Sequence, residues 1–427
     1  MLTAIVHLLI LIIFANRYFV GSFLKEVTAK KMNERVEDWE PQVSIVVPMF
    51  NEGERIVGTI NSLANQDYAP DKLEIIVVDD QSTDDSYRWA TEAAAKHPNV
   101  RVIQNPVNMG KRRGINRAVR QAESEIIVSV DSDVVVEDDA VRKLVACFVE
   151  DDIAAVGGRV NVLNKNENWL TRMQTIKYYF GYEYLKNVER AHRRVMCLSG
   201  CLTAYRRHVL VELEPVLEDR NVMGIPIKYG EDRFLTRHII KAGYKTVLTL
   251  DAVSHTIAPP TLKGYFSQQI RWRRSNLVDY MGGLSHVWKL PPLVSLHYYS
   301  LFALLLVYPA VVFDSLVRGS FWNMAMIHLA MLAGFGTMYH IQTLALPKED
   351  KVHPLNFLWM GIVMPVTYVA LTPLAIFTLD SGSWETRGHK ANRNDKLPDD
   401  VALDDLTPDE SLPDEALPGA ELPSPNP

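Results

Sequence analysis

Short runs of β-branched residues alternate with amphipathic stretches through the first half of the chain. The alternation starts with a β-branched run, and the successive segments are 43–47, 53–65, 74–78, 84–96, 110–122 and 126–130, the last again β-branched. Buried strands that alternate with helices predict a parallel sheet in an α/β domain. We expect this domain to occupy residues 42–260.

Each predicted strand is followed by polar residues. These are Asn51 and Glu52, then Asp79 and Asp80, then Asp131 and Asp133. Ordinary loop polarity would explain any one of these sets. Ligands of open parallel sheets bind at the carboxyl ends of the strands, however. Three such sets at one edge of a sheet therefore predict a binding site there.

Apolar segments in the second half of the chain predict a membrane protein. Residues 293–317 and 321–346 are each long enough to span a bilayer. Residues 355–380 are also apolar but contain Pro365 and Pro373. We expect the region 291–389 to form a transmembrane bundle.

Residues 2–24 are apolar apart from Asn16 and Arg17. A signal peptide and an interfacial anchor are alternatives, but the segment lacks a basic start and a clean small-residue cleavage site. We expect a transmembrane anchor within residues 1–41, with Arg17 extending to the headgroups. Basic residues follow the segment and none precedes it: Lys25, Lys30, Lys31 and Arg35. The positive-inside rule then places the α/β domain in the cytoplasm.

This topology leaves one question open. If 2–24, 293–317 and 321–346 each cross the membrane once, the chain is again cytoplasmic near residue 350. A full crossing by 355–380 would then place Trp384 outside. The alternatives are a segment that is re-entrant, interfacial or broken at a proline, and the sequence does not decide among them.

Two helical segments, 167–190 and 262–281, combine aromatic and basic side chains. Helices packed on the domain core would also show this composition. The second segment lies just before an apolar span, however, and we expect both helices to lie in the membrane interface. The segment 261–290 is treated as a separate interfacial element.

The net charge of −6 is unevenly distributed. From Asp395 onward, ten acidic residues and one lysine give −9, so the rest of the chain carries +3. That excess suits anionic substrates and lipid headgroups but does not indicate nucleic acid. The low-complexity tail, 390–427, is expected to be disordered. Three cysteines in so long a chain argue against a disulfide scaffold and indicate a reducing compartment.

Several polar groups have the chemistry of a transfer reaction on a phosphorylated substrate. Asp131 and Asp133, two residues apart after a strand, are suited to Mg²⁺ or Mn²⁺ beside a diphosphate, although a lone pair of this kind is common in loops. Lys111 follows a glycine at a predicted helix start, where anions bind favourably. Asp232, at the start of a predicted helix at 231–242, could accept a proton or simply favour the helix N-terminus. Trp272 offers a flat apolar face to a sugar ring or to a membrane.

In this order, the segments resemble the processive members of glycosyltransferase family 2 over about residues 40–290. The matching segments are 48–52 (PMFNE), 78–80 (VDD), 110–112 (GKR), 131–133 (DSD), 230–233 (GEDR) and 268–272 (QQIRW). Residues 197–200 (CLSG) and 384–387 (WETR) are similar to segments of hyaluronan synthases and their chitin-making relatives. Glu385 replaces a glycine usual in those enzymes, Cys201 replaces a frequent proline, and GEDR also looks like nodulation chito-oligosaccharide synthases.

The resemblance implies an inverting transfer from a UDP-sugar by an α/β domain of the GT-A type. It implies Asp232 as the catalytic base and Asp131 and Asp133 as the ligands of Mg²⁺ or Mn²⁺. It further implies a substrate-binding set in which Asp79 and Asp80 bind the uridine part and Lys111 the diphosphate. Arg271 would hold the leaving diphosphate, Trp272 the acceptor, and the loop 197–200 would face the acceptor sugar. The set is Asn51, Glu52, Asp79, Asp80, Lys111, Arg112, Asp131, Cys197, Ser199, Gly200, Gln268, Gln269, Arg271, Trp272, Trp384, Thr386 and Arg387.

The sequence thus predicts a multi-pass plasma-membrane enzyme with its catalytic domain in the cytoplasm. We expect it to polymerise UDP-GlcNAc, together with UDP-GlcA, into a β-linked polysaccharide such as hyaluronan and to export the product. A chitin or chito-oligosaccharide synthase and another exopolysaccharide synthase are alternatives. An inactive membrane sensor of sugar nucleotides is a more distant one. The expected partners are the UDP-sugar, the growing saccharide and membrane lipids, and a homo-oligomer is compatible with the sequence.

Overall fold

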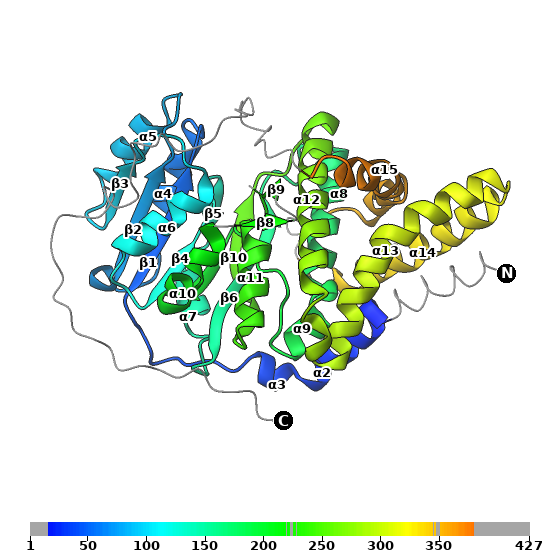
Figure 1. The fold of residues 1–427 in the computed structure, drawn as a ribbon, viewed down its shortest axis with the longest axis horizontal. Coiled ribbons are helices and arrows are strands. Elements are labelled where there is room, and N and C mark those ends of the chain that lie inside the picture. Colours follow the sequence, from blue (N-terminus) through cyan, green and yellow to red (C-terminus); the bar gives the residue numbers. More distant parts are fainter. Residues whose placement is uncertain are drawn as a thin grey trace. The chain divides into compact units, whose positions relative to one another are not determined.

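The computed structural model describes residues 16–218, 220–222, 225–227, 229–344, 346 and 351–379, and it contains a mixed eight-stranded sheet (Figure 1). The strand order is β3-β2-β1-β4-β7-β6-β10-β5. The strands are β1 (Val43–Met49), β2 (Leu73–Asp79), β3 (Val100–Gln104), β4 (Ile126–Ser129), β5 (Val134–Val136), β6 (Ile153–Val162), β7 (Thr203–Arg206) and β10 (Lys245–Thr256). Most of the expected N-terminal anchor, the segment 384–387 and the acidic tail lie outside the described residues.

The three strands predicted from the sequence are confirmed as β1, β2 and β4. They are neighbours, and β1 pairs in parallel with both of the others. Beyond these three strands the sheet is mixed. β7 runs antiparallel between β4 and β6, and β5 pairs antiparallel with β10. β7 begins at Thr203 opposite Ser129, the last residue of β4, so it starts at the carboxyl edge and must run back along the sheet.

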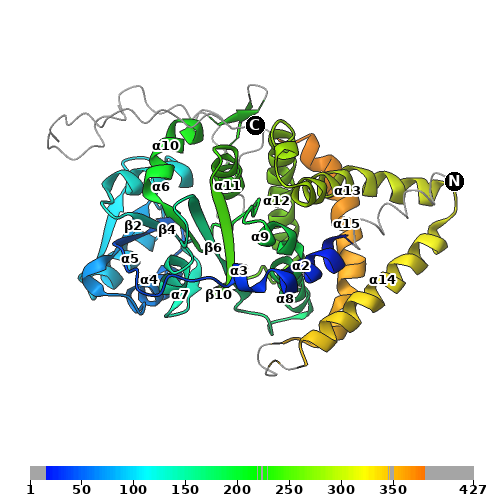
Figure 2. The ribbon, with the colours of Figure 1, turned by 90° about the horizontal axis from the view of Figure 1, so that it is seen from below.

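Six helices cover the two faces of this sheet (Figures 1 and 2). One face packs on α4 (Arg55–Ala64), α5 (Ser86–Ala94) and α7 (Ala140–Val145). The other packs on α6 (Lys111–Gln121), α10 (Arg207–Glu218) and α11 (Glu231–Lys241). The β1 side chains show why both faces are covered: Ile45 contributes to the first core and Val46 to the second, because successive strand residues point to opposite faces.

Two further helices, α8 (Trp169–Phe180) and α12 (Leu262–Gly283), lie between the sheet and the apolar helices (Figures 1 and 2). On the domain side, Arg237 of α11 donates to Asp279 of α12 at 2.8 Å. On the other side, Leu277 packs among apolar side chains of later helices. α12 therefore packs on both sides, and the expectation that α8 and α12 lie in the membrane interface stays a prediction. A π-helical turn, Gly181–Leu185, and α9 (Asn187–Ala191) follow α8.

Three segments in the described part of the chain are long and apolar enough to cross a membrane. They are α13 (Pro292–Val317), α14 (Phe321–Gln342) and Pro354–Ile376, which contains α15 (Phe357–Ile376). Large apolar side chains such as Phe313 and Trp322 are exposed on the first two, as expected for lipid-facing helices. α15 runs beside α12.

The shorter elements complete the described chain. The helices α2 (Gly21–Val27) and α3 (Ala29–Met32) follow a π-helical turn at Asn16–Val20. The strands β8 (Asn221–Val222) and β9 (Ile225–Pro226) form a separate pair. Three 3₁₀ turns lie at Pro70–Lys72, Val287–Lys289 and Pro354–Asn356.

Candidate active site

The carboxyl ends of β1, β2 and β4 bring the predicted polar residues to one edge of the sheet. The strands are adjacent in the sheet, and the Asp80 amide at the end of β2 donates to the Met49 carbonyl at the end of β1 at 2.8 Å. Asn51 takes a positive φ of 49° where the chain turns away from β1. Its side-chain oxygen accepts from the Thr83 amide at 2.9 Å, which ties the loop after β1 to the loop after β2.

Glu52 lies beneath this edge, and its side chain is buried. The Ser132 hydroxyl donates to Glu52 Oε1 at 2.8 Å, and the Ser132 carbonyl accepts from Thr59 of α4 at 2.9 Å. The middle residue of the Asp131–Asp133 turn is therefore fixed from below. Glu52, predicted to bind substrate, is placed by the structure as a support for the two carboxylates on either side of Ser132.

Asp80 is buried and holds the loop that leads into α6. Its carboxylate accepts from the amides of Met109 at 2.8 Å and Gly110 at 2.7 Å, and from the Asn105 side chain at 2.8 Å. Burial raises the pKa of Asp80, although these three donors oppose the rise. Neighbouring Asp79 accepts from Gln104 at 2.8 Å. These contacts preorganise the start of α6, and the expected role of both carboxylates toward uridine stays a prediction.

Lys111, the first residue of α6, links three separate segments. Its ammonium contacts Asp131 after β4 and lies 3.4 Å from Glu231 at the start of α11. Burial favours the neutral amine, but the Asp131 and Glu231 carboxylates outweigh it and raise the pKa of Lys111. Gly200 faces this pair closely, since a Cβ there would lie 3.2 Å from Lys111 Nζ. The residue preceding Lys111, Gly110, has a φ of 86°, which favours glycine.

Asp131 and Asp133 fit a hard divalent cation. The described part of the chain contains no group of three or more His, Cys, Asp or Glu side chains in a ligating arrangement. The protein would therefore supply few ligands, and diphosphate oxygens and water would complete the shell. That is the usual manner in which Mg²⁺ binds beside phosphates.

The start of α11 places Asp232 beside the loop 197–200. The Thr236 hydroxyl donates to the Asp232 carbonyl at 2.6 Å and accepts from the Leu198 amide at 3.3 Å. Burial, followed by the neighbouring Glu231 charge, raises the pKa of the Asp232 carboxyl; the opposing charges of Arg233 and Lys111 reduce the rise. A carboxylate whose pKa is raised in this way is suited to accept a proton.

Gly230, immediately before α11, fixes how that helix meets α12. Its φ is 70°, and a Cβ there would lie 1.9 Å from the Ser275 Oγ. Only glycine suits both the backbone conformation and the close approach. The start of α11 and the part of α12 around Ser275, distant in sequence, are thereby held against one another.

The predicted acceptor loop, 197–200, lies beside Asp131. Cys201 Sγ lies 3.6 Å from Asp131 Oδ2, and Thr203 Oγ1 donates to the Ser199 carbonyl at 2.7 Å. Burial raises the pKa of Cys197 to about 11, with Arg233 and Asp232 among the charges that act on it. The loop therefore borders both Asp131 and the proposed base. Arg112, predicted to bind substrate, has its pKa lowered by burial, and the charge of Glu218 is the largest opposing influence.

The QQIRW segment of α12 faces α8. The Gln269 side chain accepts from Lys177 at 2.6 Å and donates to Gln268 at 3.2 Å. The ring centroids of Trp272 and Tyr178 are 6.4 Å apart at an interplanar angle of 52°. The expected roles of Gln268, Gln269, Arg271 and Trp272 toward diphosphate and acceptor stay predictions.

Sequence reasoning missed the side chains that α8 and the following turn contribute. Burial, followed by the charges of Cys201 and Asp133, raises the pKa of Tyr178. Its ring centroid lies 6.4 Å from that of Trp272. Tyr182 is buried, and Lys186 lies 4.6 Å over its ring. The sequence contained a signal for these side chains, because Tyr178, Tyr182 and Lys186 follow one another at intervals of four residues.

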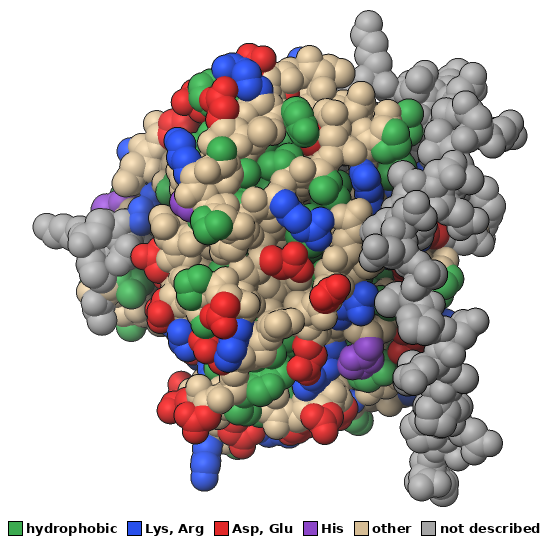
Figure 3. Space-filling model, turned by 90° about the vertical axis from the view of Figure 1, so that its left-hand side faces the viewer, with side chains coloured by type: hydrophobic (Ala, Val, Ile, Leu, Met, Phe, Trp, Pro, Cys, Tyr) green, Lys and Arg blue, Asp and Glu red, His purple; other side chains and the backbone are tan. Residues whose placement is uncertain are grey.

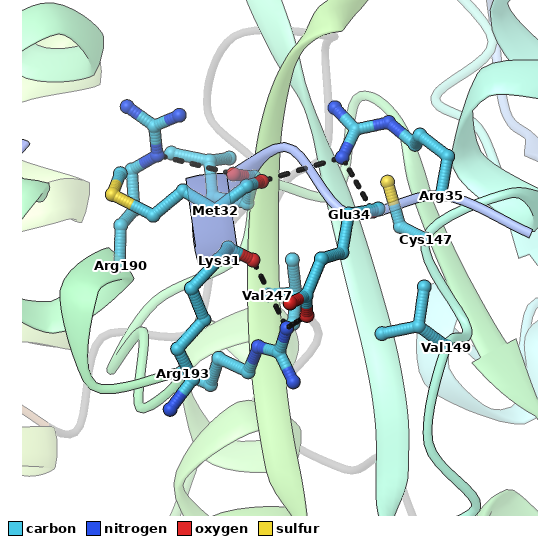
Figure 4. A pocket seen from close by; sticks show the side chains of 10 residues that line it. Lys31, Met32, Glu34, Arg35, Cys147, Val149, Arg190, Arg193 and Val247 are labelled. Carbon is cyan, nitrogen blue, oxygen red and sulfur yellow. Dashed lines mark hydrogen bonds and ion pairs between the residues drawn. The ribbon is translucent and has the colours of Figure 1, made fainter. Parts of the chain in front are cut away.

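A small cavity lies under the chain segment that enters the domain, away from these strand ends (Figure 4). Its volume of about 10 Å³ suits a single water molecule. Its basic side chains are already engaged: Arg193 donates to Glu34 at 2.6 Å and to the Lys31 carbonyl at 3.0 Å, and Arg35 donates to Asp251 at 2.7 Å. The cavity therefore belongs to the attachment of the N-terminal segment.

On the face of the molecule seen in Figure 3, acidic and basic side chains are interspersed, as on an ordinary solvated surface.

Comparison with known proteins agrees with this geometry. The family profile described as "Glycosyltransferase like family 2" matches residues 41–275. An N-acetylglucosaminyltransferase of Mesorhizobium japonicum is 34% identical over 245 residues, covering 57% of this chain and 57% of that protein. An N-acetylglucosaminyltransferase of Rhizobium meliloti is 30% identical over 369 residues, covering 81% of this chain and 82% of that protein. The chain thus spans little more than half the length of the first relative and most of the second.

One solved structure is similar over most of the chain. It is the mannosyltransferase PcManGT from Pyrobaculum calidifontis in complex with GDP-Man and Mn²⁺, with a TM-score of 0.59 at 20% identity. The similarity covers 90% of this chain and 99% of that one. It confirms the expected GT-A-like α/β fold.

Proposed function

The chain belongs to glycosyltransferase-like family 2, and on this premise we propose that it transfers N-acetylglucosamine from UDP-GlcNAc to a growing β-linked saccharide at a membrane. The observation that carries the proposal is the position of Lys111, which contacts Asp131 and lies 3.4 Å from Glu231. Lys111 thereby connects the segments proposed to bind the diphosphate, to bind the divalent cation and to accept the proton. The printed names of the rhizobial relatives support N-acetylglucosamine as the transferred sugar.

The donor would lie across the carboxyl edge of the sheet. Asp79 and Asp80 would meet the uridine part, Lys111 the diphosphate, and Arg271 the departing end of that diphosphate. A cation held by Asp131 and Asp133 would neutralise charge on the leaving group. The buried Lys111 ammonium adds a positive charge that needs no reorganisation during the reaction.

Transfer would proceed by a single displacement at the anomeric carbon. The acceptor hydroxyl oxygen forms the new glycosidic bond as the bond between that carbon and the phosphate oxygen breaks, and UDP departs. The Asp232 carboxylate takes the hydroxyl proton. Trp272 would hold the terminal acceptor sugar on its ring face, with Cys197, Ser199 and Gly200 at the opposite side.

Two products fit this chemistry. A chito-oligosaccharide requires UDP-GlcNAc alone, and the names of the relatives favour it. A hyaluronan-type polymer requires UDP-GlcA as a second donor, and the similarity of residues 384–387 to a segment of hyaluronan synthases favours it. We propose the first product as the simpler one and keep the second as the alternative. α13 and α14 would anchor the enzyme and help to export the product.

The test uses membranes that contain the full-length protein. They are incubated with radiolabelled UDP-GlcNAc, with UDP-GlcA, and with both. We expect UDP-GlcNAc alone to give a saccharide that a chitinase degrades and a hyaluronidase does not. A product formed only with both donors would select the hyaluronan-type alternative. The proposed function would be refuted if wild-type membranes released no UDP and incorporated no sugar with any donor, and so behaved like Asp232→Asn membranes.

A further inference from the structure

Lys177 of α8 lies beside the two α12 side chains that face the proposed acceptor. Its Nζ donates to Gln269 Oε1 at 2.6 Å and lies 5.1 Å from the centroid of the Trp272 ring. It also lies 5.7 Å from the ring centroid of Tyr265, one helical turn before Gln269. One ammonium group thus touches three side chains along a single face of α12. Lys177 has no part in the proposed transfer step.

The environment of Lys177 lacks the usual counter-ion. Within the described part of the chain, no carboxylate forms an ion pair with it, and the charged group that acts on it is Arg273 of α12. Arg273 is buried and lies 3.9 Å over the ring of Tyr368 on α15. The titratable groups around Lys177 are therefore Tyr265 and Arg273 from α12, with Tyr368 from α15 behind them. The ammonium is held by one amide oxygen and two ring faces.

We propose that Lys177 is a positioning residue for the acceptor: its ammonium fixes Gln269 and Trp272 so that the saccharide, in place of water, receives the donor sugar. The inference rests on the proposed function. A cation over an indole face restrains the ring, and the hydrogen bond to Gln269 fixes the neighbouring turn of the same helix. Lys177 acts through these side chains and does not take part in bond making.

The contact depends on the charge of the lysine. Burial, and then repulsion by Arg273, lowers the pKa of Lys177 to about 7. Protonation is complete below that pKa and is lost as the pH rises through it. A neutral amine can still bond to Gln269 but has no cation–π attraction to Trp272. The fraction of donor sugar that reaches the acceptor should therefore fall as the pH rises through neutrality, while hydrolysis to free sugar continues.

The experiment measures two quantities in membranes containing the full-length enzyme: UDP released from UDP-GlcNAc, and sugar incorporated into saccharide, between pH 6 and pH 9. We expect the wild-type ratio of incorporation to UDP release to fall about three- to tenfold above neutrality. Lys177→Arg stays charged throughout and should flatten this profile. Lys177→Met keeps the length without the charge and should show the low ratio at every pH. Lys263→Met, which changes an exposed lysine at the start of α12, is the matched control and should resemble wild type.

Two results would overturn the inference. One is a Lys177→Met enzyme with the wild-type ratio and pH profile, which would show that Lys177 only fills space. The other is a Lys177→Arg enzyme whose ratio still falls like the wild type, which would assign the pH dependence to another group. If the Lys177→Met enzyme fails to accumulate in the membranes, the pH profiles of the wild type and of Lys177→Arg still test the inference. Wild-type membranes that release no UDP from UDP-GlcNAc would refute the proposed function itself, and this inference with it.

Discussion

The Tyr229 hydroxyl donates to the main-chain carbonyl of Leu379 at 2.9 Å. This bond joins the residue before the segment 230–233 to the chain that leaves α15. A second bond nearby, from Arg274 of α12 to Thr378 at 3.0 Å, has the same effect. The chain therefore returns to the catalytic domain at residue 379. Of the arrangements that the sequence leaves open for 355–380, those that return the chain to the side of the catalytic domain agree with these contacts.

This geometry predicts the accessibility of two introduced cysteines. Leu379→Cys keeps the carbonyl that Tyr229 binds and should be protected from an impermeant thiol reagent added outside intact cells. Val317→Cys, at the exposed end of α13, should be labelled if α13 crosses the membrane. The three native cysteines lie in the catalytic domain. Labelling of the protein without an introduced cysteine measures their background signal. Labelling of residue 379 from outside would show that α15 crosses completely.

A second prediction concerns Gly230. Gly230→Ala should impair the enzyme severely, because it combines a strained positive φ with a clash against Ser275. Gly243→Ala is the matched control: its φ is 98°, but no neighbour lies within 4 Å of the added Cβ. The control should lose about 1–2 kcal/mol of stability, visible as a modest fall in melting temperature. Gly230→Ala should fall further, and adding Ser275→Gly should restore part of the loss. Equal effects at positions 230 and 243 would show that α12 does not approach so closely.

The sequence was sufficient for the strands and for the motifs that follow them. β1, β2 and β4 are short, buried and β-branched, so each can be recognised from its own residues. The polar residues that follow adjacent parallel strands must lie at the same edge of the sheet. The reversal of β7 could not be predicted in this way. Its direction follows from where the loop before Thr203 lies, and that depends on the whole sheet.

The contribution of α8 was missed for a different reason. Tyr178 and Tyr182 have the composition of a membrane anchor, and the same side chains serve either purpose. Which face of α8 meets Trp272 depends on how α8 packs against α12. Glu52 illustrates the opposite limit: it belongs to a recognisable motif, but its Oε1 accepts from the Ser132 hydroxyl and so supports the turn after β4. A motif does not reveal the direction in which a carboxylate points.

A third prediction concerns the cation. Asp133→Ala should reduce transfer by at least about 100-fold, since stabilisation of the leaving diphosphate is worth several kcal/mol. Asp138→Ala, an exposed aspartate five residues later, is the matched control and should leave transfer unchanged. EDTA should abolish wild-type activity, and Mn²⁺ or Mg²⁺ should restore it. Full turnover in EDTA would contradict a cation at Asp131 and Asp133.

The last prediction concerns Asp232 and pH. A general base must be ionised, and a raised pKa means that ionisation is lost at a higher pH than the value of about 3.9 for an ordinary aspartate. Wild-type transfer should therefore be present above the Asp232 pKa and should fall as the pH drops through it.

Two variants at the start of α11 separate this effect from other acid losses. Glu231→Gln removes the neighbouring charge that raises the Asp232 pKa, so the fall should move to lower pH. Asp232→Asn should reduce transfer by about 10²- to 10⁴-fold at every pH while UDP-GlcNAc binding persists, because the base contributes in the transition state. The measurements are initial rates of incorporation across the acid range and donor binding by equilibrium titration. An Asp232→Asn enzyme with near-normal transfer, or a Glu231→Gln profile shifted to higher pH, would remove Asp232 from the role of base.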